Sequence, residues 1–98
     1  MLKIIKVTGD SMMPVYQEGD FVVLATSSFL FGRIKSGDIV VFTHHIYGTM
    51  IKKVLSIDSD LINVGGTNIH SLDSRKLGPI DRHMLLGKVI WHIPGPHR

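Results

Sequence analysis

Two apolar runs in the middle of the chain, GDIVVFTH (residues 37–44) and TMIKKVLSI (residues 49–57), decide the fold class. Both are rich in Val and Ile, which favour the pleated, half-buried surface of a strand, and turn residues bound them. Four further runs of the same kind occur along the 98 residues: KIIKV, DFVVLA, DLINVGG and LLGKVIWHI. Six short strands without a dozen-residue helical period predict an all-β protein, in the form of a compact, partly closed barrel or sandwich.

The composition is that of one small domain with a core of its own, which we expect to span residues 1–98. Hydrophobic residues make up 44% of the chain, and there are no cysteines, so disulfides, thiolate metal sites and a cysteine nucleophile are excluded. The net charge of +3 comes from scattered Lys and Arg residues rather than from one stripe, which argues against a nucleic-acid partner.

The sequence has no apolar run that reaches the roughly 18–20 residues needed to cross a bilayer. A strand-like run follows Met1 at once, without the apolar region and small-residue cleavage site of a signal peptide. We therefore expect a cytoplasmic protein if the chain is complete. If an amino-terminal anchor has been removed, we expect a protein on the extracytoplasmic face of a membrane.

Turn signals add two local expectations. Gly-Asp occurs twice directly before an apolar run, at residues 19–20 and 37–38, which predicts the same turn-then-strand unit in both places. Farther along, DRHMLLG (residues 81–87) is interpreted as a single helical turn that Asp81 opens.

Phe29, Leu30 and Phe31 form an apolar cluster between serine and glycine, in SSFLFGRI. One interpretation is that they are core residues at the end of a strand. The other is that they form an exposed apolar lip for an apolar substrate or for a membrane surface, and a membrane-surface contact is predicted here under that second interpretation.

Ser11 is the candidate for chemistry in the amino-terminal part, within VTGDSMMPVYQEGDFVVL (residues 7–24). A serine nucleophile needs a base that takes its proton at neutral pH. The usual base is histidine with a carboxylate behind it, and the chain has six histidines. None of them stands in a recognisable triad context, and nothing in the spacing supports a His-Asp pair.

Lysine is the other base known for serine nucleophiles. An ordinary lysine is charged at pH 7, but burial among apolar side chains disfavours the ammonium and lowers the pKa of the amine toward about 7–8. Lys52 and Lys53 lie in the middle of the run TMIKKVLSI, on opposite faces of the predicted strand. Since both faces are apolar, periodicity does not choose between the two. A plain alternative is an edge strand that its lysines protect against aggregation.

Four blocks in this order resemble the signal peptidase I family of Ser/Lys proteases: GDSMMPVYQEGDFVVL, GDIVVF, MIKKVLSI and GGTNIHSLDSRKLGPI…LLGKVIW. The resemblance covers nearly the whole chain. GDSM alone is weak, because self-cleaving repressors of the LexA type share it. The last block is similar to the signal peptidase side of this protease type and not to the repressors. The resemblance implies the compact β-fold of these proteases and a serine endopeptidase.

Carried over by position, the resemblance assigns Ser11 as the nucleophile and Lys52 as the general base. Lys53 falls where the family commonly has a second basic residue with a structural role. Met12 and Pro14 match the methionine and proline that follow the family's nucleophile.

Three residues of the last block match groups that support the dyad. Ser71 matches a serine whose hydroxyl helps to orient the base, with an ordinary turn hydroxyl as the alternative. Asp73 and Arg75 match an ion pair that braces the site. We interpret these two as supporting residues that do not react.

The chemistry that the resemblance implies is acyl transfer from a precursor polypeptide bound in extended form, with removal of a leader or signal peptide. The oxyanion is expected at the backbone N–H of Ser11 and a second donor. Some bacterial members place a serine two residues before the nucleophile, where this chain has Gly9, so the second donor stays open. Gly9, Asp10 and Met12 are expected nearest to the substrate. No cofactor and no metal are expected.

The chain also departs from the signal peptidase pattern. Only ten residues precede Ser11, SIDSDLINVGG leaves no room for a second β-domain, and the family's GDN turn reads GGTN. A small, anchorless protease of this kind is similar to the maturation proteases that trim a nickel-type superoxide dismutase. The competing interpretation is the catalytic core of a membrane-bound signal peptidase.

Three rival functions from other classes remain. They are a catalytically idle peptide-binding module of the same fold, a self-cleaving repressor domain, and a histidine-bound metal site. Adjacent His44 and His45 are expected to point to opposite faces of a strand, which argues against the metal.

Overall fold

The computed structural model describes residues 2–7, 16–26, 34–66 and 77–95, and in these ranges the chain forms seven strands and one 3-10 helix. The elements are β1 (Leu2–Lys6), β2 (Phe21–Ala25), β3 (Ile39–His44), β4 (Gly48–Asp58), β5 (Leu61–Gly65), β6 (Ile80–Asp81), η1 (Arg82–Met84) and β7 (Leu85–Ile93). Neighbouring strands are all antiparallel, in the order β1-β2-β7-β3-β4-β5-β6. The all-β prediction is confirmed.

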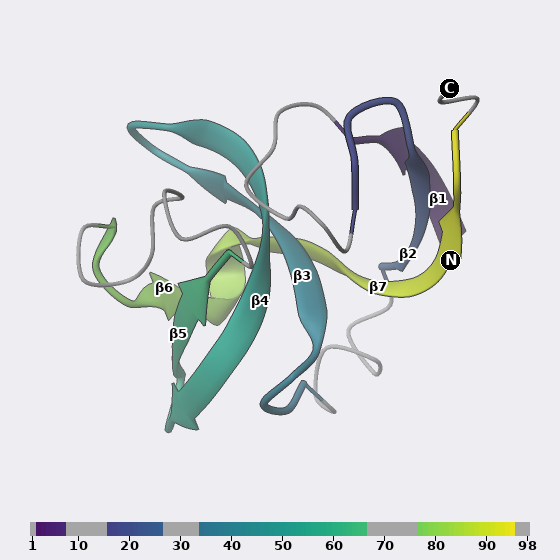
Figure 1. Cartoon of the computed structure of the whole chain (residues 1–98). Helices are drawn as coiled ribbons and strands as arrows, with labels where there is room; N and C mark the ends of the chain where they lie inside the picture. Colours follow the sequence, from purple (N-terminus) through teal and green to yellow (C-terminus); the bar gives the residue numbers. More distant parts are fainter. Residues whose placement is uncertain (1, 8–15, 27–33, 67–76, 96–98) are drawn as a thin grey trace.

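The strands make one curved sheet that does not close on itself in the described part of the chain, where β1 and β6 are the two edges. Figure 1 shows β1 and β2 at one side of the molecule and β5 and β6 at the other, with β3, β4 and β7 between them. β7 joins the two halves: its carboxyl-terminal part pairs with β2, and its amino-terminal part pairs with β3.

Hydrophobic residues bury both faces of the central strands. Val40 and Phe42 of β3 belong to one core cluster, and Val41, between them in sequence, belongs to a second cluster with Ile51 of β4. Successive side chains of a strand point to opposite faces, so the two clusters lie on the two sides of β3. This explains why residues 40–42 do not alternate between apolar and polar: at these positions neither face of β3 is open to water.

The two Gly-Asp units form as the sequence predicts. Gly19 and Gly37 have φ values of 96° and 95°, in the left-handed region that favours glycine. In each unit the backbone N–H of the aspartate donates to the carbonyl three residues earlier, Gln17 (3.0 Å) or Lys35 (3.1 Å). The strands β2 and β3 begin directly after these turns.

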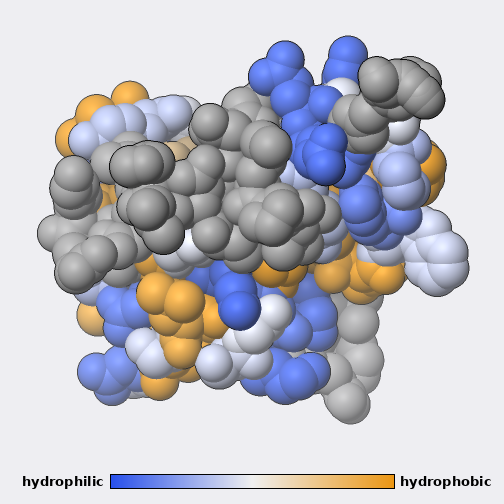
Figure 2. Space-filling model, viewed as in Figure 1, coloured by the Kyte–Doolittle hydropathy of each residue, from blue (hydrophilic) through white to orange (hydrophobic). Residues whose placement is uncertain are grey.

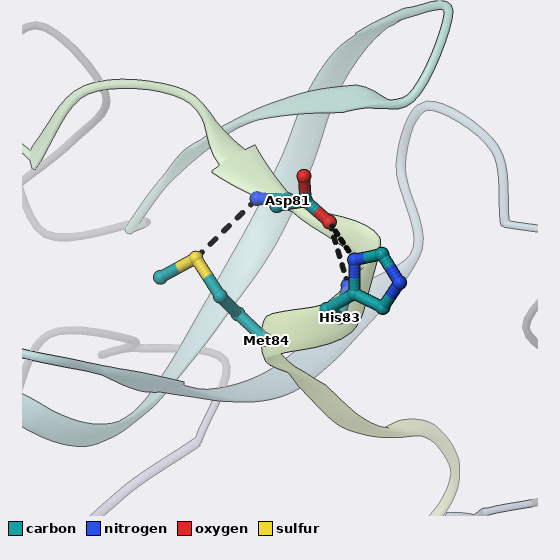
Figure 3. A network of polar contacts seen from close by, with 3 residues as sticks. All are labelled: Asp81, His83 and Met84. Carbon is teal, nitrogen blue, oxygen red and sulfur yellow. Dashed lines mark hydrogen bonds and ion pairs between the residues drawn. The ribbon is translucent and has the colours of Figure 1, made fainter.

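The helical turn expected after Asp81 is the 3-10 helix η1, whose amino-terminal cap is Asp81. The Asp81 carboxylate accepts from the backbone N–H of His83 (2.9 Å) and lies 2.7 Å from its Nδ1, while the Asp81 N–H donates to the sulfur of Met84 (3.4 Å) (Figure 3). The hydrogen bonds from His83, first the one from its backbone N–H and then the one from its ring, lower the pKa of the Asp81 carboxyl below its usual value. The side chains of Asp81 and His83 are both exposed.

One face of the β1–β2–β7 part of the sheet remains apolar and open. Ile4, Val23 and Trp91 lie side by side across it, and Trp91 is 67% exposed. Apolar side chains also appear in Figure 2 over this part of the molecule. Among the described residues there is no helix long and apolar enough to cross a membrane.

Candidate active site

Burial separates the two lysines that the sequence pattern left equivalent. Lys52 of β4 is 1% exposed, whereas the next residue, Lys53, is exposed. Lys52 lies directly opposite Val40 of β3 in the antiparallel ladder. β4 pairs with β3 on one side and with β5 on the other, so it is an interior strand of the sheet. The alternative of an edge strand protected by its lysines is therefore wrong.

The environment of Lys52 is apolar on its own face of the sheet. Val54, two residues on, points to the same side, and both Val40 and Val54 have no exposed surface. Directly opposite residues of an antiparallel pair have Cβ atoms about 5 Å apart, so Val40 packs against the stem of Lys52. Such a setting disfavours a charged amine that has left water.

The second Gly-Asp turn fixes β4 next to this lysine. The Gly37 N–H donates to the carbonyl of Val54 (2.8 Å), and the Val54 N–H donates to the carbonyl of Asp38 (2.7 Å). The Asp38 carboxylate accepts from the backbone N–H of Lys35 (2.9 Å) and pairs with the Lys88 amine of β7 (3.2 Å). The backbone of β4 beside Lys52 is therefore hydrogen-bonded to β3, to β5 and to this turn.

The first Gly-Asp turn closes the base of the segment that carries Ser11. The Val7 N–H donates to the carbonyl of Asp20 (2.7 Å), and the Gly19 N–H donates to the carbonyl of Val7 (3.0 Å). Val7 and this turn are thus hydrogen-bonded to each other. In sequence, the expected nucleophile lies between these two fixed points.

Sequence reasoning missed an Asp-His pair at that point. Asp20 is 3% exposed, and its Oδ2 accepts from Nε2 of His92 at 2.6 Å. The two residues are 72 positions apart, so spacing carried no signal. The register supplies the link: Val22, two residues after Asp20, pairs with His92 across β2 and β7.

Other groups complete the surroundings of this carboxylate. Its Oδ1 accepts from the Gly95 N–H (2.9 Å), and its Oδ2 also accepts from the Gln17 N–H (3.0 Å). The ring of Tyr16 meets that of His92 edge-on, with centroids 4.7 Å apart. Burial raises the pKa of the Tyr16 phenol above its usual value.

The expectation for His44 and His45 was wrong in its geometry. His44 ends β3 and is buried, but His45 lies beyond the strand, and the two rings stack with centroids 4.7 Å apart. Nδ1 of His44 accepts from the N–H of Ile46 (3.1 Å), and Nε2 faces the carbonyl of Leu77 (3.3 Å). His44 is therefore a structural residue of the β3–β4 hairpin. Within the described ranges, no three His, Asp or Glu side chains gather as a metal site.

Several predicted residues lie outside the described ranges. They are Gly9, Asp10, Ser11, Met12 and Pro14 around the expected nucleophile, the supporting residues Ser71, Asp73 and Arg75, and the apolar cluster Phe29, Leu30 and Phe31. Their assignments stay predictions.

Together, the all-β sheet and the family comparison define a peptidase-type fold. A family model described as Peptidase S24-like matches residues 1–90, and the chain belongs to that family. The match covers both Ser11 and Lys52. No curated protein matches the chain.

Proposed function

We propose that this protein is a serine endopeptidase in which Ser11 is the nucleophile and Lys52 the general base, and that it removes a leader or signal peptide from a precursor. The observation that carries the proposal is the contrast in β4 between Lys52, which is 1% exposed, and its exposed neighbour Lys53. A lysine acts as a base at neutral pH only if its amine is uncharged, and removal from water favours that form.

The proposed reaction is acyl transfer in two steps. The neutral amine of Lys52 takes the proton of the Ser11 hydroxyl while its oxygen attacks a peptide carbonyl, and the proton then passes to the leaving amine. In the second step the same amine takes a proton from water, whose oxygen attacks the ester; the bond between the acyl group and the Ser11 oxygen breaks, and the proton passes from Lys52 to that oxygen. The backbone N–H of Ser11 is one proposed oxyanion donor.

The supporting roles follow the resemblance to signal peptidases. Ser71 orients the amine of Lys52, and Asp73 and Arg75 brace the site as an ion pair. Gly9, Asp10, Met12 and Pro14 line the place where an extended substrate binds. The small maturation proteases of nickel-type superoxide dismutase are the proposed subtype.

The test is cleavage of leader-bearing precursors by the purified protein and three variants. Ser11→Ala and Lys52→Met each lower the rate at least about 10³-fold, since each removes one half of the dyad. Lys53→Met is the matched control, with the same change one residue away on the exposed side, and retains most activity. Circular dichroism checks that all variants are folded.

The outcomes separate the alternatives. Loss of activity in Lys53→Met but not in Lys52→Met would show that the wrong lysine had been chosen. Binding of the precursor without cleavage would identify a catalytically idle peptide-binding module. A superoxide dismutase precursor and a secretory precursor, tested side by side, distinguish the maturation protease from a signal peptidase core.

A further inference from the structure

We infer that Asp20 and His92 are positioning residues: they tie the Gly-Asp turn at residues 17–20, to which Val7 is also hydrogen-bonded, to the end of β7, and so fix both ends of the segment that carries Ser11. This inference rests on the proposed function for its catalytic consequence, which is that the rate of the reaction depends on residues at the carboxyl-terminal end of the sheet. Neither residue needs to touch the substrate.

The first observation is the number of chain segments that meet at one buried carboxylate. Asp20 accepts from His92 of β7, from the N–H of Gly95 beyond β7, and from the N–H of Gln17 before its own turn. A carboxylate can only accept hydrogen bonds, so each of these groups donates to it. Hydrogen bonds to an ionised acceptor are stronger than neutral ones, and this carboxylate is 3% exposed.

The second observation is where this carboxylate lies along the chain. The carbonyl of Asp20 and the N–H of Gly19 bind the two backbone groups of Val7. Both ends of the intervening segment, residues 8–18, are therefore fixed at the residue that also binds β7. If the contacts of Asp20 with His92 and Gly95 are lost, Val7 and the turn stay hydrogen-bonded to each other, but the Asp20 carboxylate no longer connects them to β7.

The third observation is the close approach of Gly95 to the turn. A Cβ atom added at Gly95 would collide with the carbonyl oxygen of Gly19. The backbone of Gly95 thus packs directly against the Gly-Asp turn, and this contact requires a residue without a Cβ atom at position 95. This gives a way to disturb the contact without removing any polar side chain.

The structure also contains a matched control pair. Asp81 and His83 make a carboxylate–imidazole contact of 2.7 Å, close to the 2.6 Å of Asp20 and His92. The control pair is exposed, caps η1, and lies on residues only two positions apart in sequence (Figure 3). A change there alters the same chemistry without removing any of the groups that donate to Asp20.

The experiment compares hydrogen–deuterium exchange and precursor cleavage in the full chain and four variants. His92→Phe keeps a ring beside Tyr16 but removes the donor, and Gly95→Ala pushes the backbone away. His92→Gln can restore the hydrogen bond through its amide, and His83→Phe is the control. Each is studied at a temperature where circular dichroism shows it folded.

We expect exchange of backbone amides in residues 8–16 to speed up about tenfold in His92→Phe and Gly95→Ala, and to return toward the wild-type rate in His92→Gln. We expect kcat to fall about 10–100-fold in the first two variants with KM little changed, because misalignment affects the reacting atoms more than binding. His83→Phe changes neither quantity.

Two results would overturn the inference. One is unchanged exchange in residues 8–16, or a rise spread evenly over the whole chain, since either excludes a local hold on this segment. The other is an unchanged kcat in His92→Phe and Gly95→Ala, measured beside a wild-type protein that does cleave precursors. If the wild-type protein cleaves nothing, the peptidase proposal fails, and the exchange pattern alone decides whether the pair holds the segment.

Discussion

The two Gly-Asp turns are nearly identical in themselves and differ in what surrounds them. Each has a glycine with φ near 95° followed by an aspartate whose carboxylate accepts from the N–H three residues earlier, at 3.0 Å for Gln17 and 2.9 Å for Lys35. Asp20, however, is buried against His92 and Gly95, whereas Asp38 pairs with Lys88 at the margin of the core. The local motif determines the turn, and the tertiary partners determine what the carboxylate holds.

Each of the two turns also adjoins a different member of the proposed dyad. The turn at Asp20 closes the segment that contains Ser11, and the turn at Asp38 binds the backbone of Val54, two residues after Lys52. Both aspartates reach β7, one through His92 and the other through Lys88. The two Gly-Asp turns therefore connect the chain next to each member of the proposed dyad to the same strand, β7.

The largest expected effect comes from removing the two carboxylates. We expect Asp20→Ala to lower the free energy of unfolding by about 3 kcal/mol, because it removes a buried carboxylate and leaves the donors of His92, Gly95 and Gln17 without their acceptor. Asp38→Ala costs about 1.5 kcal/mol, since the amine of Lys88 can turn toward water. Urea unfolding of both variants measures the difference. Equal losses would show that the surroundings of the two turns do not matter for stability.

A smaller effect is expected from the backbone of the second turn alone. At Gly37 an added Cβ meets no atom within 4 Å, so Gly37→Ala tests only the cost of a positive φ, about 1 kcal/mol. The same unfolding measurement applies. A loss well above this value would mean that the turn is strained for a reason other than the glycine conformation.

The smallest expected effect on stability appears at alkaline pH and comes from Tyr16, whose ring contacts His92, the partner of Asp20. Burial raises the pKa of the Tyr16 phenol, so its neutral form contributes stability that is present below the unfolded pKa near 10 and is lost as pH rises through the folded value. Spectrophotometric titration of the wild-type protein and Tyr16→Phe shows which ionisation disappears. An early ionisation of Tyr16 would contradict its burial.

The strands and turns could be predicted from the sequence because their signals are local. All six expected runs are strands, and both Gly-Asp turns and the turn after Asp81 form. Strand β6, with two residues, is too short to leave a pattern. The prediction for His45 failed because it assumed that the strand continued beyond His44.

The site was less predictable because it depends on contacts between distant strands. Periodicity treated Lys52 and Lys53 alike, since apolar residues flank both; the packing of the core, which buries Lys52 and leaves Lys53 exposed, separates them. The Asp20–His92 contact follows from the pairing of β2 with β7, which no local signal announces. The family's site pattern supplied Ser11 and its supporting residues, and their roles stay predictions.

The place of β7 has a consequence for how the protein is made. It is synthesised after the other six described strands, yet in the sheet it lies between β2 and β3 and pairs with both. The earlier strands can form two separate hairpin-like pieces during translation, but ladder contacts between these pieces wait for residues 85–93. We expect the nascent chain to stay inactive until that strand docks, so that a newly synthesised molecule gains its proposed activity in the final step of folding.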